Sequence, residues 1–79
     1  MKLELFYKDS CPFCQKVIRF IDKHELKDKI EFLDIVKDKD AKKRLVDEGG
    51  MNQVPCLFVD GKPMYESSDI IEFLKSNLL

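Results

Sequence analysis

Two cysteines separated by a Pro-Phe pair are the residues of this sequence best suited to chemistry. Cys11 and Cys14 stand in the stretch KDSCPFCQKVIRF, where an apolar helical pattern begins. This spacing places two thiols about one helical turn apart. Such a pair can bind a metal ion, form a structural disulfide or act as a redox couple, and the surrounding residues must decide among the three.

The predicted helix makes the two thiols unequal. At the helix start Cys11 would face unpaired backbone N–H groups and the positive end of the helix dipole, which stabilise a thiolate. Cys14 lies one turn inside, on the apolar stripe with Val17, Ile18 and Ile21. There we expect it to be shielded and to hold its proton more firmly. Thiol-disulfide exchange needs this inequality, so we expect an exposed nucleophile at Cys11 and a shielded resolving thiol at Cys14.

Two flanking features support redox chemistry. Lys8 adds a positive charge that steadies a thiolate or attracts an anionic partner, and Pro12 fixes the backbone of the first helical turn. Further along, Gln53-Val54-Pro55 precedes a predicted strand. A cis bond at Pro55 would turn backbone groups of Val54 outward, toward an extended thiol substrate. The alternative interpretation of Pro55 is a proline that only starts the strand.

A metal site is disfavoured by the count of ligands. Zinc would need two more nitrogen or sulfur ligands, and the chain offers only Cys56 and the lone His24. We therefore expect no metal. A dimer that holds an iron-sulfur cluster through Cys11 and external thiols stays open as an alternative. Cys56 is interpreted as a small core residue on a buried strand.

Length and composition indicate one small globular domain over residues 1–79. The chain is 44% hydrophobic and 37% charged, with 14 basic and 15 acidic residues, so its charge gives no hint of nucleic acid. No apolar run is long enough for a membrane span, and the first residues do not form a signal peptide. We expect a cytoplasmic protein, where a structural disulfide is unlikely to persist.

Hydrophobic periodicity predicts the order β-α-β-α-β-β-α, with a four-stranded mixed sheet flanked by helices. We expect strands over 2–7, 30–35, 56–59 and 62–65, and helices from 12 to about 24 or 26, from 38 to 48, and from 67 or 68 onward. Ala41, Leu45 and Val46 are the apolar residues of the second helix. The charged stretch 37–44 interleaves both signs, so it is interpreted as a solvated face and not as a docking surface.

These features, taken in order, closely resemble the glutaredoxins of the thioredoxin-like fold, over essentially the whole chain. The resemblance rests on Cys-Pro-Phe-Cys at 11–14, on Val54-Pro55, and on Ser68-Asp69 at the start of the last helix. It implies that Cys11 is the nucleophile, that Cys14 resolves, and that Pro55 is cis. It also implies a glutathione site formed by Lys8, Phe13, Gln53, Val54, Pro55, Ser67, Ser68 and Asp69.

Within that implied site, Lys8 and Gln53 match positions near the glycine carboxylate of glutathione. Val54 matches the residue whose backbone pairs with the cysteinyl part, while Ser68 and Asp69 match those that hold the γ-glutamyl end. Simple helix capping is the alternative role for residues 67–69. One departure stands out. Glutaredoxins carry Gly-Gly before the last helix, whereas this chain has Tyr65-Glu66-Ser67, whose Glu-Ser is similar to that of glutathione S-transferase N-terminal domains.

The resemblance implies a monomeric, glutathione-dependent oxidoreductase that reduces glutathione mixed disulfides and protein disulfides. Its partners would be glutathione and glutathionylated or disulfide-containing proteins, with neither nucleic acid nor membrane. Two alternatives remain open on the residues alone. One is a thioredoxin-like electron donor fed by a reductase, and the other is a module that binds a glutathione-ligated iron-sulfur cluster.

Overall fold

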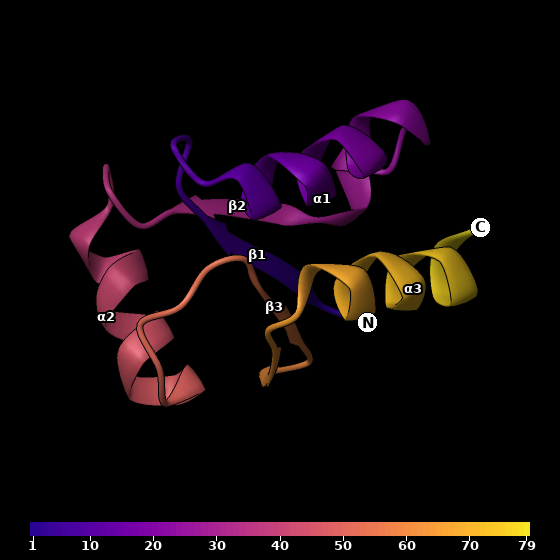
Figure 1. The fold of residues 1–79 in the computed structure, drawn as a ribbon. Coiled ribbons are helices and arrows are strands. Elements are labelled where there is room, and N and C mark those ends of the chain that lie inside the picture. Colours follow the sequence, from indigo (N-terminus) through magenta and orange to yellow (C-terminus); the bar gives the residue numbers. More distant parts are fainter.

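The computed structural model describes all 79 residues and forms one mixed sheet covered by three helices (Figure 1). The sheet order is β2-β1-β3-β4, in which β1 and β2 are parallel and the other neighbours are antiparallel. The predicted order of elements and the mixed sheet are confirmed. The elements are β1 (Leu3–Tyr7), α1 (Pro12–Lys23), β2 (Glu31–Asp34), α2 (Lys39–Gly49), β3 (Cys56–Val59), β4 (Lys62–Met64) and α3 (Ser67–Leu78).

Alternation along β1 divides the core into two layers. Leu3 and Leu5 point to one face of the sheet, where they pack with buried residues of α1 and α3. Glu4 and Phe6 point to the opposite face, where α2 packs. Successive strand residues face opposite sides, so one short strand supplies both layers. Figure 1 shows the result, with α1 and α3 together and α2 apart from them.

The helix ends are set by local residues. Cys11 precedes α1 and Pro12 occupies its first position, where the missing N–H costs nothing. Asp38 caps α2 by accepting hydrogen bonds from the N–H groups of Asp40 and Ala41, at 3.0 and 3.2 Å. Gly50 ends α2 with φ of +84°, a left-handed conformation that glycine adopts at little cost. The predicted stop at Gly49-Gly50 is therefore confirmed.

Element bounds differ from the sequence prediction by a residue or two, and the structure adds details that the sequence did not predict. A short 3₁₀ turn, Lys27–Lys29, lies between α1 and β2. The second strand is one residue shorter at each end than the predicted 30–35, although the Ile35 N–H still donates a hydrogen bond to the Tyr7 carbonyl oxygen at 3.0 Å. Of the three apolar residues of the second helix, Ala41 and Leu45 are buried, whereas Val46 is 41% exposed. At helical spacing Ala41 and Leu45 share one face, whereas Val46 is turned about 100° from Leu45 toward solvent.

A buried ion pair ties α2 to the sheet. Glu4, only 2% exposed, accepts two hydrogen bonds from the Arg44 guanidinium, at 2.7 and 3.2 Å. The guanidinium carbon also lies 5.5 Å from the centre of the Phe6 ring and 5.8 Å from that of Phe58. Hydrogen bonds from Arg44, the largest cause, hold the pKa of Glu4 below its ordinary value. Arg44 thus belongs to the interior contact of α2 and not to a solvated face.

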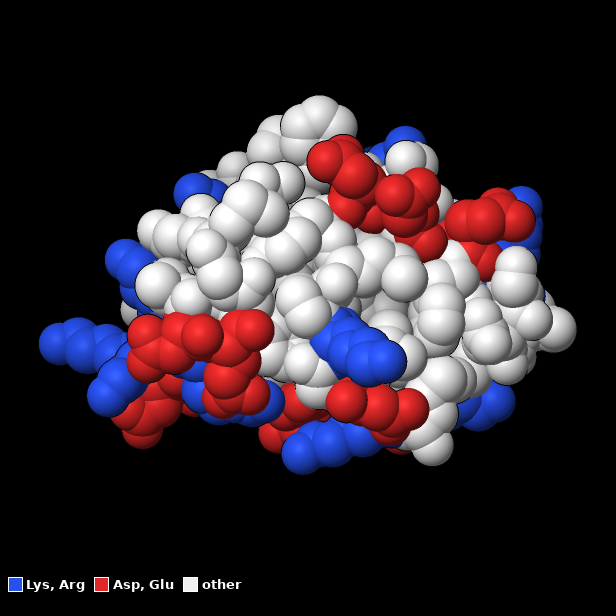
Figure 2. Space-filling model, turned by 90° about the horizontal axis from the view of Figure 1, so that it is seen from below, with Lys and Arg blue, Asp and Glu red and all other residues white.

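The remaining charges lie on the surface. Figure 2 shows acidic and basic side chains close to one another around an uncharged central area of the face it presents. Neither sign dominates that face, in keeping with the net charge of −1. None of the helices has the length and apolar character needed to cross a membrane.

Candidate active site

Cys11 is the N-cap residue of α1. Its backbone is extended, with φ of −93° and ψ of 115°, and its sulfur accepts a hydrogen bond from the Cys14 N–H at 3.3 Å. This is the position at which a side-chain acceptor satisfies the free N–H groups of a first helical turn. A thiolate is a better acceptor than a thiol there, because it carries the charge that the helix end favours.

Cys14 is fully buried below Cys11. Burial is the largest cause that raises the pKa of the Cys14 thiol well above its ordinary value, and the hydrogen bond with Cys11 raises it further. The backbone and charge of Lys8 offset part of this shift. The predicted inequality is therefore present, with the inner thiol strongly favoured in its protonated form.

The structure corrects one expectation about Cys11, which was predicted to be exposed and is only 8% exposed. The segment 54–55 lies over it, and the Cys11 thiol donates a hydrogen bond to the Val54 carbonyl oxygen at 3.8 Å. The Val54-Pro55 bond is cis, as the resemblance implied. Residues 43 positions apart in the chain thus meet at the Cys11 sulfur, and Cys11 also lines a groove.

A groove of about 750 Å³ opens beside Cys11 on the α2 side. Its lining includes four of the predicted site residues, Lys8, Cys11, Gln53 and Val54. Lys39, Lys42 and Asn52 also line it, and the sequence did not single them out. The signal for the two lysines was their spacing of three on one helix, which places them on the same face. The mixed charge of the surrounding stretch concealed that signal.

A second hollow, of about 160 Å³, lies on the other side of the same segment. The predicted residues Phe13, Pro55 and Ser67 line it, together with Gln53 and Val54, which line both hollows. Tyr65 and Glu66, the residues that replace the Gly-Gly pair, line it as well. The Val54 segment therefore stands between two hollows that lead from α2 to the start of α3.

Ser68 and Asp69 line neither hollow, although both lie in the first turn of α3, directly after Ser67. The alternative role for residues 67–69 was helix capping, and in the structure none of their side chains caps α3. The N-cap residue is Glu66, and no side chain caps this helix. The first helix-type bond at this end is donated by the Ile70 N–H, to the Glu66 carbonyl. The three preceding N–H groups have no partner within the helix and can receive an anion.

Tyr65 lines the second hollow and also contacts the end of α2. Its hydroxyl donates a hydrogen bond to the carbonyl oxygen of Gly49, the last residue of α2. It also contacts the Cys56 thiol, whose pKa burial raises to about 11. Cys56 is fully buried, which confirms its interpretation as a core residue. Tyr65 thus joins both ends of the loop 50–55 that carries Gln53, Val54 and Pro55.

Metal ligands do not cluster in this structure, which has no group of three His, Cys, Asp or Glu side chains arranged to hold an ion. The three cysteines are all free thiols. His24 lies at the far end of α1, where its ring packs 4.5 Å from that of Phe20.

The glutaredoxin family model matches residues 3–64 of the chain. The chain is 32% identical over 76 residues to glutaredoxin-C4, chloroplastic, of Oryza sativa subsp. japonica. The aligned residues make up 95% of this chain and 57% of that protein. The chain is 34% identical over 77 residues to prostaglandin E synthase 2 of Danio rerio, covering 96% of this chain and 19% of that protein. The chain thus spans less than two thirds of the length of either curated relative.

Solved structures agree with the family match. The thioredoxin-like protein BC3987 superposes with a TM-score of 0.78 at 27% identity, covering 95% of this chain and 97% of that one. Reduced Escherichia coli glutaredoxin superposes with a TM-score of 0.70 at 26% identity, covering 99% and 98%. Because the family match includes both Cys11 and Cys14 and the Val54-Pro55 segment beside them, the chain belongs to the glutaredoxin family, whose members are thiol-disulfide oxidoreductases.

Proposed function

We propose that this chain is a glutathione-dependent thiol-disulfide oxidoreductase that reduces glutathione mixed disulfides and protein disulfides. The observation that carries the proposal is the unequal dithiol beside the Val54 carbonyl, between two hollows that end at a lysine and at a free helix N-terminus. Glutathione carries a thiol between two carboxylates, one at its glycine end and one at its γ-glutamyl end. That order of groups matches the order of features along the site.

In the proposed complex glutathione crosses the Val54 segment. Its glycine carboxylate lies near Lys8 and Gln53, and its cysteinyl part pairs with the Val54 backbone and brings its sulfur to Cys11. Its γ-glutamyl end lies at the start of α3, where free N–H groups favour a carboxylate. Asp69 accepts a hydrogen bond from the ammonium group of that end. Phe13 and Pro55 border the second hollow and give its walls apolar surface.

The monothiol route uses Cys11 alone. Its thiolate attacks the glutathione sulfur of a mixed disulfide, a Cys11–glutathione disulfide forms, and the substrate leaves as a thiolate that takes up a proton. A second glutathione thiolate then attacks the bound glutathione sulfur. Oxidised glutathione leaves and the Cys11 thiolate is restored, so one free glutathione is oxidised for each substrate thiol released, and the other half of the oxidised glutathione comes from the mixed disulfide.

The dithiol route adds Cys14. The Cys11 thiolate attacks a protein disulfide and forms a mixed disulfide with one of its sulfurs, while the other leaves as a thiol. Cys14 then loses its proton and attacks the Cys11 sulfur, which releases the second substrate thiol and leaves a Cys11–Cys14 disulfide. Two molecules of glutathione reduce that disulfide and leave as oxidised glutathione.

A coupled assay tests the proposal. The purified protein is given the mixed disulfide of glutathione and 2-mercaptoethanol, with glutathione and glutathione reductase as the electron source. A parallel reaction receives thioredoxin reductase in place of both. We expect turnover with glutathione. Turnover only with thioredoxin reductase would identify the chain as a thioredoxin-like electron donor instead.

We further propose that the protein acts as a monomer in the cytoplasm.

A further inference from the structure

The charged side chains that line the groove beside Cys11 are all basic. Its charged lining residues are Lys8, Lys39 and Lys42, and the rest of the lining is polar or apolar. The chain as a whole has a net charge of −1, so this sign is a local property of the groove. One lysine suffices for the single glycine carboxylate of glutathione. The two lysines of α2 are therefore in excess of what that co-substrate requires.

The fold creates this charge separation from a mixed sequence. Asp34 accepts hydrogen bonds from the N–H groups of Val36 and Lys37, at 2.8 and 3.1 Å. Asp38 accepts those of Asp40 and Ala41 as the cap of α2. Two acids of the segment are thus turned to the backbone, while Lys39 and Lys42 line the groove. Asp34 and Asp9 line an adjoining hollow of about 200 Å³, which shares Ser10 and Val36 with the groove.

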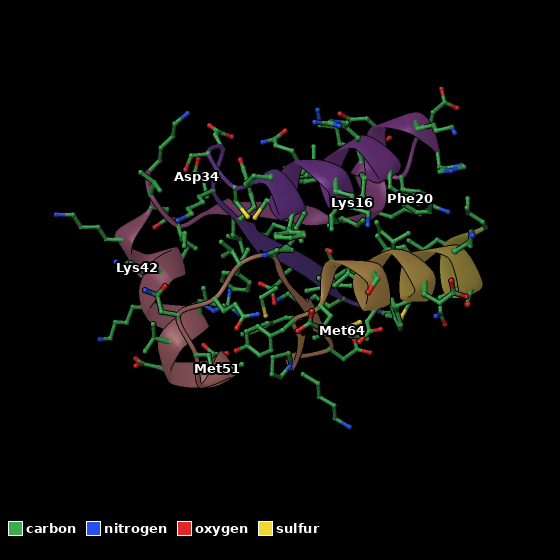
Figure 3. The ribbon with its side chains drawn as sticks, viewed as in Figure 1. Lys16, Phe20, Asp34, Lys42, Met51 and Met64 are labelled. Carbon is green, nitrogen blue, oxygen red and sulfur yellow. The ribbon has the colours of Figure 1, made fainter.

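The groove also offers apolar contact and a path to the reacting sulfur. Val36, 70% exposed, lies on its wall with Ile35, and Cys11 and Pro12 lie at its inner end. Figure 3 shows that Lys42 and Asp34 both lie at this end of the molecule. A polypeptide whose cysteine reaches Cys11 would run along this groove toward the first turns of α2. The residues beside that cysteine would meet the two lysines.

We propose that this groove docks protein substrates through acidic residues that flank the target cysteine, with Lys39 and Lys42 as the residues that determine this preference. The proposal rests on the proposed function and adds the class of protein substrate to it. Exposed charge pairs contribute modestly and are screened by salt. We therefore expect a preference of about threefold to tenfold for an acidic segment, falling toward unity in high salt.

Three peptides of equal length test the proposal, each glutathionylated at one cysteine that is flanked by Glu, Gln or Lys. The measured quantity is the ratio of kcat/KM for the acidic peptide to that for the Gln peptide, taken within each variant. This ratio cancels any change that both substrates share, including a change in glutathione binding. The variants are wild type, the double variant Lys39→Gln with Lys42→Gln, and Lys43→Gln. Lys43 is exposed on the same helix but does not line the groove.

We expect wild type and Lys43→Gln to prefer the acidic peptide, and the double variant to lose the preference. A ratio of one in wild type would overturn the docking proposal, as would an equal loss in Lys43→Gln. A double variant that slows all peptides equally would show that the lysines serve glutathione instead.

Binding without turnover separates the two proposals. The same peptides are made with serine for cysteine and a fluorescent label, and their affinity is measured by anisotropy. Tighter binding of the acidic peptide, lost in the double variant, supports docking even if the coupled assay shows no glutathione-dependent turnover. Equal binding of all three peptides overturns docking even if that assay succeeds.

Discussion

At the residue scale, the chemistry rests on a difference between two thiols that are three residues apart. Cys11 is the helix N-cap and lines the groove on the α2 side, whereas Cys14 is fully enclosed. The Cys14 N–H donates a hydrogen bond to the Cys11 sulfur, and such a bond stabilises negative charge on its acceptor. An attacking thiol must be reached by the substrate disulfide, and of the two thiols only Cys11 lines a groove.

Serine variants test this division of roles. We expect Cys11→Ser to abolish turnover, because a hydroxyl at this site cannot replace a thiolate as the attacking group. Cys14→Ser should keep reduction of glutathione mixed disulfides, since the monothiol route does not use the inner thiol. Initial rates in the coupled assay measure both. Substantial turnover by Cys11→Ser would refute the assignment of the nucleophile.

The raised pKa of Cys14 predicts how the dithiol route depends on pH. Only the thiolate attacks, and below its pKa the thiolate fraction of Cys14 grows about tenfold per pH unit. Burial, and not the hydrogen bond with Cys11, is the largest cause of the raised pKa of Cys14. Release of glutathione from the Cys11–glutathione form of the wild type should therefore accelerate from about pH 6.5 to 8.5.

Rapid mixing with a fluorescent thiol reagent for the released glutathione measures this step. Cys14→Ser, charged with glutathione in the same way, is the control and should show no such release. A release rate that does not change with pH would contradict the conclusion that deprotonation of the buried thiol limits resolution.

At the element scale, the start of α3 borders the second hollow. Its first turn offers N–H groups with no intrahelical partner and no side-chain cap, next to the second hollow. An uncapped helix end is less stable than a capped one by about 1 kcal/mol. This end therefore costs some stability and leaves its N–H groups available to an anion.

Asp69→Ala tests whether this helix end holds the γ-glutamyl group. Asp69 is exposed in the first turn, where it would accept from the ammonium group of glutathione. We expect a several-fold higher KM for glutathione with a smaller change in kcat, since the lost contact lies far from the reacting sulfurs. Glu72→Ala, an exposed acid of the next turn, is the matched control. An unchanged KM in Asp69→Ala would remove this group from the binding site.

The contact between Tyr65 and Gly49 joins α2 to the segment before α3. A Cβ atom at Gly49 would lie 2.6 Å from the Tyr65 hydroxyl oxygen and 3.3 Å from the Phe58 ring. Gly49→Ala should therefore lower the free energy of unfolding by about 1 to 3 kcal/mol. Tyr65→Phe removes the oxygen that the new methyl group would meet. The double variant should be more stable than the sum of the single effects predicts, by about 1 kcal/mol.

Urea denaturation of the four proteins of this cycle measures that coupling. Simple additivity would show that the hydroxyl and the Gly49 position act independently. Because the contact closes the loop that carries Gln53 and Val54, Gly49→Ala should also raise the KM for glutathione.

At the scale of the whole molecule, the two layers of the fold have different chemistry. The layer of α1 and α3 is apolar, whereas the α2 layer contains the buried Glu4–Arg44 pair. Arg44→Met leaves the Glu4 carboxylate buried without its main partner, so we expect a loss of about 2 to 4 kcal/mol in the free energy of unfolding at pH 7. Lys43→Met is the control, because its side chain lies outside the core.

The same pair predicts sensitivity to acid. The pKa of Glu4 is held below its ordinary value of 4.5, so the folded state binds this proton less readily than the unfolded state. Stability from the pair is then present above about pH 4.5 and is lost as the pH falls through the lower, folded pKa. The difference between wild type and Arg44→Met should therefore shrink in acid. A difference that stays constant from pH 7 to pH 3 would contradict this account.

The sequence by itself determined the order of elements and most of their bounds. Period-two alternation in Leu3–Tyr7, helical spacing from Cys14 to Ile21, and glycines at the end of α2 are local signals that burial reinforces. The inequality of the two thiols was also predictable, since helix position and apolar spacing set it. The bounds of the second strand were mispredicted, because hydropathy alone does not state at which residue a strand ends, and it left open which apolar residues of α2 are buried.

Only the tertiary structure decided what surrounds the thiols. It places the Val54 carbonyl over Cys11, which leaves the predicted exposed nucleophile largely buried. It also separates the charges of the stretch 37–44, with Arg44 on Glu4, and Lys39 and Lys42 in the groove. The physical reason is distance along the chain. Local pattern sets helices and strands, whereas contacts between residues 40 or more positions apart depend on how those elements pack.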